Sequence, residues 1–195
     1  DGDSCFSKHA CGGGMYNFNS SPVITNCSFQ NNIAPYGGGM CTLSSSNPNI
    51  SNCTFQNNTA TNQGGGIYNT YSLPRISSCT FVNNSAASYG GGTFNYFSDY
   101  ILYMCTFVDN KALANSGGGI YNENCNPCLI SCNLVGNSVA IADPNAGGGM
   151  YNYQCSLVTI TDSSFQSNSA FHGGGIHSYQ STVTITNCTF QSNQG

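Results

Sequence analysis

The sequence predicts an all-β fold, a single-stranded right-handed parallel β-helix in which residues 1–195 form one domain. A Gly-Gly-Gly triplet recurs every 25 to 30 residues, and these triplets hold 21 of the 24 glycines. A nine-residue motif, Ile-x-x-Cys-x-Phe-x-x-Asn, recurs in phase with the triplets. Short runs of Ile, Phe, Thr, Val and Tyr, without sustained 3.6-residue periodicity, favour strands over helices. A period of about 26 residues therefore predicts about seven or eight turns with three strands each. The triplets begin at Gly12, Gly37, Gly64, Gly90, Gly117, Gly147 and Gly173.

Stacked turns lie about 4.8 Å apart, so each position of the motif becomes a column of like residues along the solenoid. The Ile, Cys and Phe positions are expected to face the core, with Leu134 replacing Phe and Ser163 replacing Cys. Asn26 and Asn52 lie where a sharp corner needs a left-handed backbone. The Asn that ends each motif is expected to join a ladder of amide hydrogen bonds. The Phe column comprises Phe29, Phe55, Phe81, Phe107, Leu134, Phe165 and Phe190, and the Asn column comprises Asn32, Asn58, Asn84, Asn110, Asn137, Asn168 and Asn193.

Charged residues are scarce, since three Lys or Arg and seven Asp or Glu give a net charge of −4. So few cations exclude a phosphate-binding face, and no nucleic-acid partner is expected. No run reaches the ~18 consecutive apolar residues of a spanning helix, so no membrane insertion is expected. Twelve cysteines are typical of an extracellular or cell-surface protein.

The Gly-Gly-x-Ile and Phe-x-x-Asn repeats, as at Gly64 to Ile67 and Phe55 to Asn58, resemble those of the chlamydial polymorphic outer membrane proteins and related bacterial β-helix repeat proteins. The resemblance covers nearly the whole chain. It implies a β-helix passenger that is displayed at a surface and is adhesive. This chain departs from the family pattern at the third triplet position, which is Gly in every copy.

The chain is expected not to be an enzyme and to need no cofactor. Polysaccharide lyases and hydrolases with this fold group carboxylates on one face, to bind Ca²⁺ or to act as acid and base. The seven acids here lie at different offsets within the repeat, so no catalytic residue is assigned. Cys125, Cys128 and Cys132 have metal-ligand spacing, but Cys132 belongs to the core column, and no metal site is assigned. The acids are Asp1, Asp3, Asp99, Asp109, Glu123, Asp143 and Asp162.

Cys125 and Cys155 form the candidate disulfide. Both lie eight residues after the start of their triplets, so they are expected one above the other. The spacing between turns falls within the range of Cα separations that a disulfide bridges. The alternative is that the cysteines of this chain are unreacted thiols.

One aromatic residue follows the inward residue after most triplets. Alternation along a strand places it on the outer face, which predicts a surface stripe. Such a stripe would contact sugars or another protein, and the alternative is that it only stabilises the sheet. A column of Ser and Thr beside each Phe suggests ice binding as a further alternative. The stripe comprises Tyr16, Tyr68, Phe94, Tyr121 and Tyr151.

Seven Asn-x-Ser/Thr sites occur, and the shortage of charge suggests that attached sugars hydrate the surface. Asn19, Asn57 and Asn83 are the preferred acceptors. Three of the other sites, Asn26, Asn52 and Asn187, are corner residues that we expect to be enclosed.

The first functional hypothesis is an extracellular structural protein that assembles head-to-tail with copies of itself into a fibre or surface layer. The last motif ends near the phase at which the first begins, so one end continues the other. The second hypothesis is an adhesin or carbohydrate-binding module with glycans as partners of the Tyr stripe. A polysaccharide lyase or hydrolase is the third, and the scattered acids disfavour it.

Overall fold

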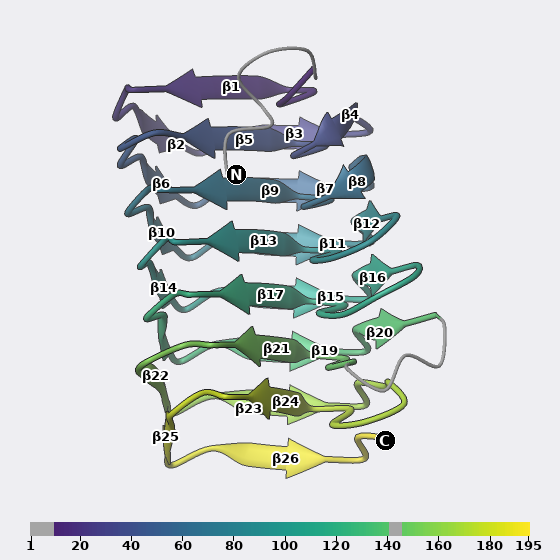
Figure 1. Ribbon diagram of the computed structural model, residues 1–195. Helices are drawn as coiled ribbons and strands as arrows, with labels where there is room; N and C mark the ends of the chain where they lie inside the picture. Colours follow the sequence, from purple (N-terminus) through teal and green to yellow (C-terminus); the bar gives the residue numbers. More distant parts are fainter. Residues whose placement is uncertain (1–9, 141–145) are drawn as a thin grey trace.

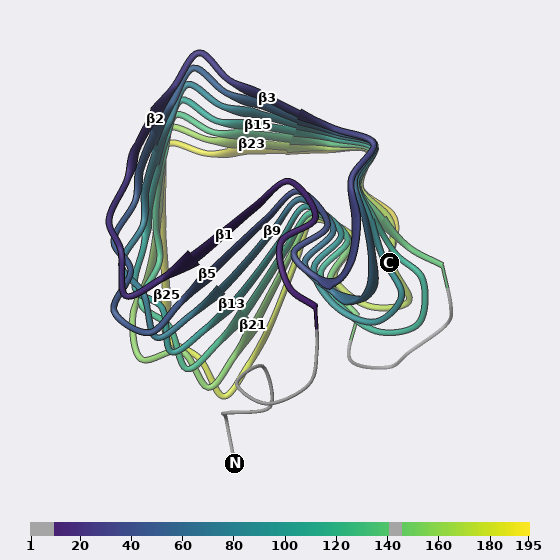
Figure 2. The same cartoon turned by 90° about the horizontal axis from the view of Figure 1, so that it is seen from above.

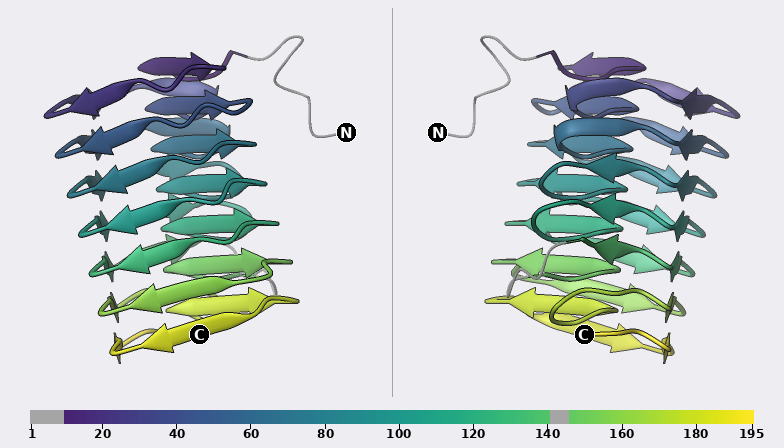
Figure 3. Two further views of the ribbon diagram at one scale, coloured as in Figure 1. Left: turned by 90° about the vertical axis from the view of Figure 1, so that its left-hand side faces the viewer. Right: turned by 90° about the vertical axis from the view of Figure 1, so that its right-hand side faces the viewer.

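The computed structural model of the protein describes residues 10–140 and 146–195. These residues form a stack of seven turns, which follow one another in chain order along one axis (Figures 1 and 3). Every pairing between named strands is parallel, and each joins a strand to its counterpart one turn away. The expectation of an all-β parallel solenoid is thereby confirmed, at the lower of the two expected numbers of turns.

Each turn contributes one strand to each of three sheets, and five turns also contribute to a fourth. Sheet 1 contains β1 (Met15–Phe18), β5 (Met40–Leu43), β9 (Ile67–Thr70), β13 (Thr93–Tyr96), β17 (Ile120–Glu123), β21 (Met150–Tyr153) and β24 (Ile176–Tyr179). Sheet 2 contains β2 (Val23–Thr25), β6 (Asn49–Ser51), β10 (Arg75–Ser77), β14 (Ile101–Tyr103), β18 (Cys128–Ile130), β22 (Val158–Thr161) and β25 (Val183–Thr186). Sheet 3 contains β3 (Ser28–Gln30), β7 (Thr54–Gln56), β11 (Thr80–Val82), β15 (Thr106–Val108), β19 (Asn133–Val135), β23 (Ser164–Gln166) and β26 (Thr189–Gln191). Sheet 4 contains β4 (Ile33–Tyr36), β8 (Thr59–Gln63), β12 (Ser85–Ala86), β16 (Lys111–Ala112) and β20 (Ser138–Val139).

The core lies between sheets 1, 2 and 3, which enclose it on three sides when the stack is viewed along its axis (Figure 2). The Phe column is confirmed, with ring centroids 4.9 Å apart for Phe55 and Phe81 and 4.4 Å apart for Phe81 and Phe107. Leu134 separates this run of stacked rings from a second run in the C-terminal turns. The Cys column is also confirmed, and its sulfurs accept hydrogen bonds from the backbone of the adjacent turn. The Cys53 N–H donates to the Cys79 sulfur at 3.4 Å. Where Ser replaces Cys, the Cys132 N–H donates to the Ser163 hydroxyl at 3.0 Å, so both side chains serve as acceptors.

The corners explain why Asn and Gly recur. Asn52 and Asn57 have φ values of 52° and 54°, a left-handed conformation that Asn tolerates better than most residues. The residue after Asn57, Asn58, points inward, and its side-chain amide Nδ2 donates to the side-chain oxygen Oδ1 of Asn84 at 2.9 Å. The amide ladder is therefore confirmed. In the triplets, Gly64 has a φ of 69°, and a Cβ on Gly65 would overlap the carbonyl oxygen of Gly91 in the next turn.

A second polar ladder runs inside sheet 1. The Asn69 amide donates to Asn95 at 2.9 Å, and the same pattern continues toward the C-terminal turns. The ladder is interrupted at Thr42, which lies between Asn17 and Asn69 in the register of the sheet. Three buried polar atoms in the described residues have no hydrogen-bond partner, namely Asn17 Nδ2, Thr42 Oγ1 and Asn69 Oδ1. All three lie at this interruption, because the Thr side chain is too short to bridge its neighbours.

We predict that Thr42→Asn stabilises the protein. The new amide would accept from Asn17 and donate to Asn69, and each net hydrogen bond contributes about 1 kcal/mol to the free energy of unfolding. Thr42→Val is the matched control, because it removes the unpaired hydroxyl and bridges nothing. Urea denaturation should give a higher free energy of unfolding for Thr42→Asn than for Thr42→Val. An Asn variant no more stable than the Val variant would contradict the role of Thr42 as the break in the amide ladder.

Candidate functional site

The rings of the aromatic stripe stack on one another between turns. The prediction that they lie at the surface is wrong for four of the five residues. Tyr16 is 50% exposed, whereas Tyr68, Phe94, Tyr121 and Tyr151 are 4 to 7% exposed. The rings of Tyr68 and Phe94 lie 5.0 Å apart and nearly parallel. The stripe therefore forms a second apolar cluster outside the main core.

The cover comes from residues that directly precede the triplets, at the end of β4 and in the loops that follow the other strands of sheet 4. Figure 2 shows these loops beside the end of sheet 1 at which the triplets enter. Tyr36 lies 5.1 Å from Tyr68, and Tyr89 lies 4.7 Å from Tyr121, measured between ring centroids. Alternation along the strand gave the correct face of the sheet. Tyr36 and Tyr89 directly precede their triplets, but this position holds Cys, Gln, Ser, Ala or His in the other turns, so the repeat did not predict that aromatic residues cover this face.

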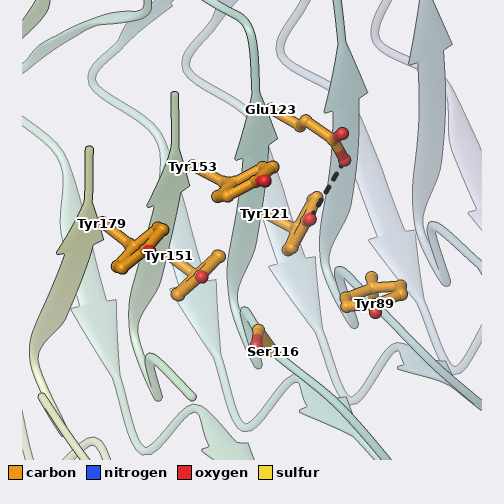
Figure 4. A pocket seen from close by; sticks show the side chains of 7 residues that line it. All are labelled: Tyr89, Ser116, Tyr121, Glu123, Tyr151, Tyr153 and Tyr179. Carbon is orange, nitrogen blue, oxygen red and sulfur yellow. Dashed lines mark hydrogen bonds between the residues drawn. The ribbon is translucent and has the colours of Figure 1, made fainter. Parts of the chain in front are cut away.

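A pocket of about 440 Å³ opens beside this cluster at the C-terminal half of the stack (Figure 4). Three consecutive strands of sheet 1, which are β17, β21 and β24, supply most of its wall. Two loop residues complete it. Five tyrosines, one serine and one glutamate line the pocket, namely Tyr89, Ser116, Tyr121, Glu123, Tyr151, Tyr153 and Tyr179.

The tyrosines of the pocket form two rows, as Figure 4 shows. Tyr121 and Tyr151 continue the predicted stripe, with ring centroids 5.4 Å apart. Tyr153 and Tyr179 lie two residues further along their strands, with ring centroids 5.9 Å apart. This second row was not predicted from the sequence, although the alternation that placed the stripe outside also places the residue two positions later on the same face.

Glu123 occupies the second row, in register with Tyr96 on one side and Tyr153 on the other. The Tyr121 hydroxyl donates to its Oε2 at 3.1 Å. Burial raises the pKa of the Glu123 carboxyl, and the hydrogen bond from Tyr121 offsets part of that rise. Burial also raises the pKa of Tyr121 far above its ordinary value, with a smaller contribution from the Glu123 charge. Tyr121 is therefore a neutral donor at any physiological pH.

The chemistry of the pocket suits binding. Tyrosine offers a broad apolar ring together with a polar hydroxyl, and a single carboxylate adds one localised charge. Glycoside hydrolysis normally needs two carboxylates on either side of the bond, and only Glu123 lines this pocket. The other described acids lie in three further columns. Asp109 and Asp162 are corner residues with positive φ, and Asp99 accepts a backbone hydrogen bond from Asn126 at 2.6 Å. That the chain is not an enzyme stays a prediction.

Cys125 and Cys155 lie one above the other as expected, because the strands that precede them pair in register. Both are buried free thiols in this structure. They belong to a column of hydrogen-bond acceptors that also contains Ser98, whose N–H donates to the Cys125 sulfur at 3.4 Å. Burial raises the pKa of the Cys125 thiol to about 12, so it stays protonated at neutral pH. The disulfide itself stays a prediction.

No group of three His, Cys, Asp or Glu side chains suited to a metal ion occurs within residues 10–140 and 146–195. The same residues contain no helix long and apolar enough to cross a membrane.

The preferred glycosylation candidates Asn19, Asn57 and Asn83 are exposed. The expectation that corner sites are enclosed is wrong, because Asn26, Asn52 and Asn187 are exposed as well, and so is Asn49. At a corner the left-handed Asn directs its side chain outward, and the following residue faces the core. Exposure alone therefore does not distinguish the seven sites.

A comparison with protein-family models matches residues 3–135 to the right handed beta helix region. No curated protein and no solved structure matches the chain at a significant level. The finer resemblance to the chlamydial outer membrane proteins therefore stays a prediction. The matched segment is 133 residues long, which is more than half of the 195, and it agrees with the parallel stack described above. The chain belongs to the right-handed β-helix family.

Proposed function

We propose that this chain is a repeat protein that binds glycans at the cell surface or outside the cell, through the pocket on sheet 1. The observation that carries the proposal is the wall of five tyrosines, four of which come from three consecutive strands of sheet 1. Glycans combine apolar ring faces with hydroxyl groups. Tyrosine complements both, because its ring is apolar and its hydroxyl donates and accepts hydrogen bonds.

The shape of the site supports a chain-like ligand. Glu123, Tyr153 and Tyr179 occupy the same position of β17, β21 and β24, so polar and aromatic side chains repeat from turn to turn at the parallel-strand spacing of about 4.8 Å. A polymer with a regular repeat can use several such contacts at once, whereas a small molecule uses one or two. The ligand that fits best is therefore an oligosaccharide that lies along the axis.

The location outside the cell is also a proposal. Its support is the scarcity of charge together with seven exposed Asn-x-Ser/Thr sites, since attached sugars would hydrate a neutral surface. Treatment with an N-glycosidase should lower the intact mass of the protein from its native source, because it removes the attached sugars. A mass that this treatment leaves unchanged would contradict glycosylation.

Tyr179→Ala should weaken oligosaccharide binding by about 10-fold or more, since it removes one ring of the pocket wall. Tyr103→Ala is the matched control, because both side chains are 47% exposed and Tyr103 lies on sheet 2, away from the pocket. Isothermal titration calorimetry with neutral β-linked hexasaccharides measures both variants. Equal losses in the two variants, or none in either, would contradict the pocket as the binding site.

Head-to-tail assembly is the second proposed function, and the outer turns of the stack support it. Ile185 and Phe190 continue the core columns of Ile and Phe, yet they are 45% and 47% exposed on the last turn. On the first turn, Phe29 continues the same column and is half-buried. We propose that a second copy of this chain stacks its first turn on this last turn. Seven turns would then give an axial repeat of about 34 Å per subunit.

Phe190→Asp should abolish this self-association, because it places a charge in the apolar contact between copies. Leu157→Asp is the control, since Leu157 is 52% exposed and lies in the connection between β21 and β22, on the side of the stack. Sedimentation velocity over a range of concentrations should show oligomers for the control and monomers for Phe190→Asp. A wild-type chain that stays monomeric at high concentration would exclude the assembly.

A further inference from the structure

We propose that the pocket selects glycans that carry positively charged amino groups, and that Glu123 is the residue that pairs with the ammonium. This inference rests on the proposed glycan-binding function and specifies its ligand class. The chemical class is an oligosaccharide of amino sugars with free amines, as distinct from neutral, N-acetylated or uronic acid oligosaccharides.

The first support is the place of Glu123 in the fold. It interrupts the second row of tyrosines, between Tyr96 and Tyr153, so the column puts a carboxylate where the neighbouring turns have phenols. Glu123 is only partly exposed, and a half-buried carboxylate needs compensation. Within the described part of the chain, the side-chain carboxylate of Glu123 accepts one hydrogen bond, from the Tyr121 hydroxyl, and takes part in no ion pair. An ionised carboxylate has room for about four such bonds, so Glu123 keeps acceptor capacity on the pocket side.

The second support is the surrounding rings. A cation is attracted to the face of an aromatic ring within about 6 Å. The stack of Tyr153 and Tyr179 ends at Glu123, so the outer ring face of Tyr153 lies beside the carboxylate and makes a site for an ammonium group. Five tyrosines line this pocket together with Glu123 (Figure 4). The cations of the described residues, Arg75 and Lys111, do not line it. Within residues 10–140 and 146–195, no Lys or Arg therefore competes with a ligand ammonium at this wall.

The carboxylate and the rings together predict how the affinity of the pocket differs among three classes of sugar. An amino sugar gains the carboxylate and the rings together. A neutral sugar gains the rings and leaves the carboxylate without a charged partner. A uronic acid brings a second negative charge toward Glu123, in a protein whose net charge is already −4. The expected affinity order is therefore amino sugar above neutral sugar above uronic acid.

The test compares three hexasaccharides by isothermal titration calorimetry at pH 6, against the wild-type chain and Glu123→Gln. The probes are a β-1,4-glucosamine hexamer, its neutral glucose counterpart and a galacturonic acid hexamer. The wild type should bind the glucosamine hexamer about 10-fold or more tightly than the neutral one, because hydrogen bonds to charged groups are the stronger class. Glu123→Gln should remove this preference, so that the glucosamine and glucose hexamers bind the variant within about twofold of each other.

A pH profile adds a readout that a merely structural role of Glu123 would not change. With a permanently charged, N-trimethylated glucosamine hexamer, only the protein titrates. Binding should weaken as the pH falls and Glu123 takes up a proton, with a midpoint above the ordinary pKa of Glu because burial raises it. Tyr121→Phe should move this midpoint to higher pH, because it removes the hydrogen bond that lowers the pKa of Glu123.

The outcomes separate this inference from the function on which it rests. If the neutral hexamer binds as tightly as the glucosamine hexamer, the pocket binds glycans without selecting amines, and the inference fails alone. If Glu123→Gln keeps the preference, another group pairs with the ammonium, and the inference fails alone. If the wild type binds none of the hexamers, the glycan-binding function fails as well. The wild-type affinity order needs no variant, so the test holds even if Glu123→Gln does not fold.

Discussion

The parallel hydrogen bonds between successive turns are the interaction on which the rest of this structure depends. Each strand pairs with the strand one turn later at the same motif position, as when Phe81 pairs with Phe55 and Phe107. Register is thereby fixed for every side chain, since a slip of one residue would turn the Phe column out of the core. A single position of the repeat thus sets the chemistry of a whole column, and the residues that fill a column best are those that stack on copies of themselves.

Self-stacking explains which residues fill the columns. Phe rings stack at 4.4 to 5.0 Å, and amides donate to the amide of the next turn at 2.9 Å. Cys and Ser serve the same corner positions because sulfur and hydroxyl oxygen both accept a backbone N–H from the adjacent turn. This role accounts for the abundance of cysteine without any bond between sulfurs. Where a residue does not propagate its column, as at Thr42, the cost falls on its neighbours in the same column, which lose their partners.

Interruptions of a column are also where specific chemistry can arise. In the second row of sheet 1 the turns offer Tyr96, Tyr153 and Tyr179, and Glu123 breaks that series with the one carboxylate of the pocket. A uniform column gives an extended, repetitive surface suited to a polymer. One exception in it gives a point of recognition along that surface. The proposed function therefore combines the regularity of the fold with a local departure from it.

The sequence by itself determined the fold class, the phase of the turns, the inward columns and the amide ladder, because these follow from a repeat that stacks at one spacing. It also determined the outer face of the Tyr stripe, through the alternation of side chains along a strand. Only the tertiary structure decided that this face is covered, because the loops after sheet 4 vary in length and the residue that ends them, directly before each triplet, varies in type. Tyr89 and Ser116, which complete the pocket, come from those loops. The neighbours of Glu123 followed from register, but its burial depended on the packing of segments that no periodic pattern describes.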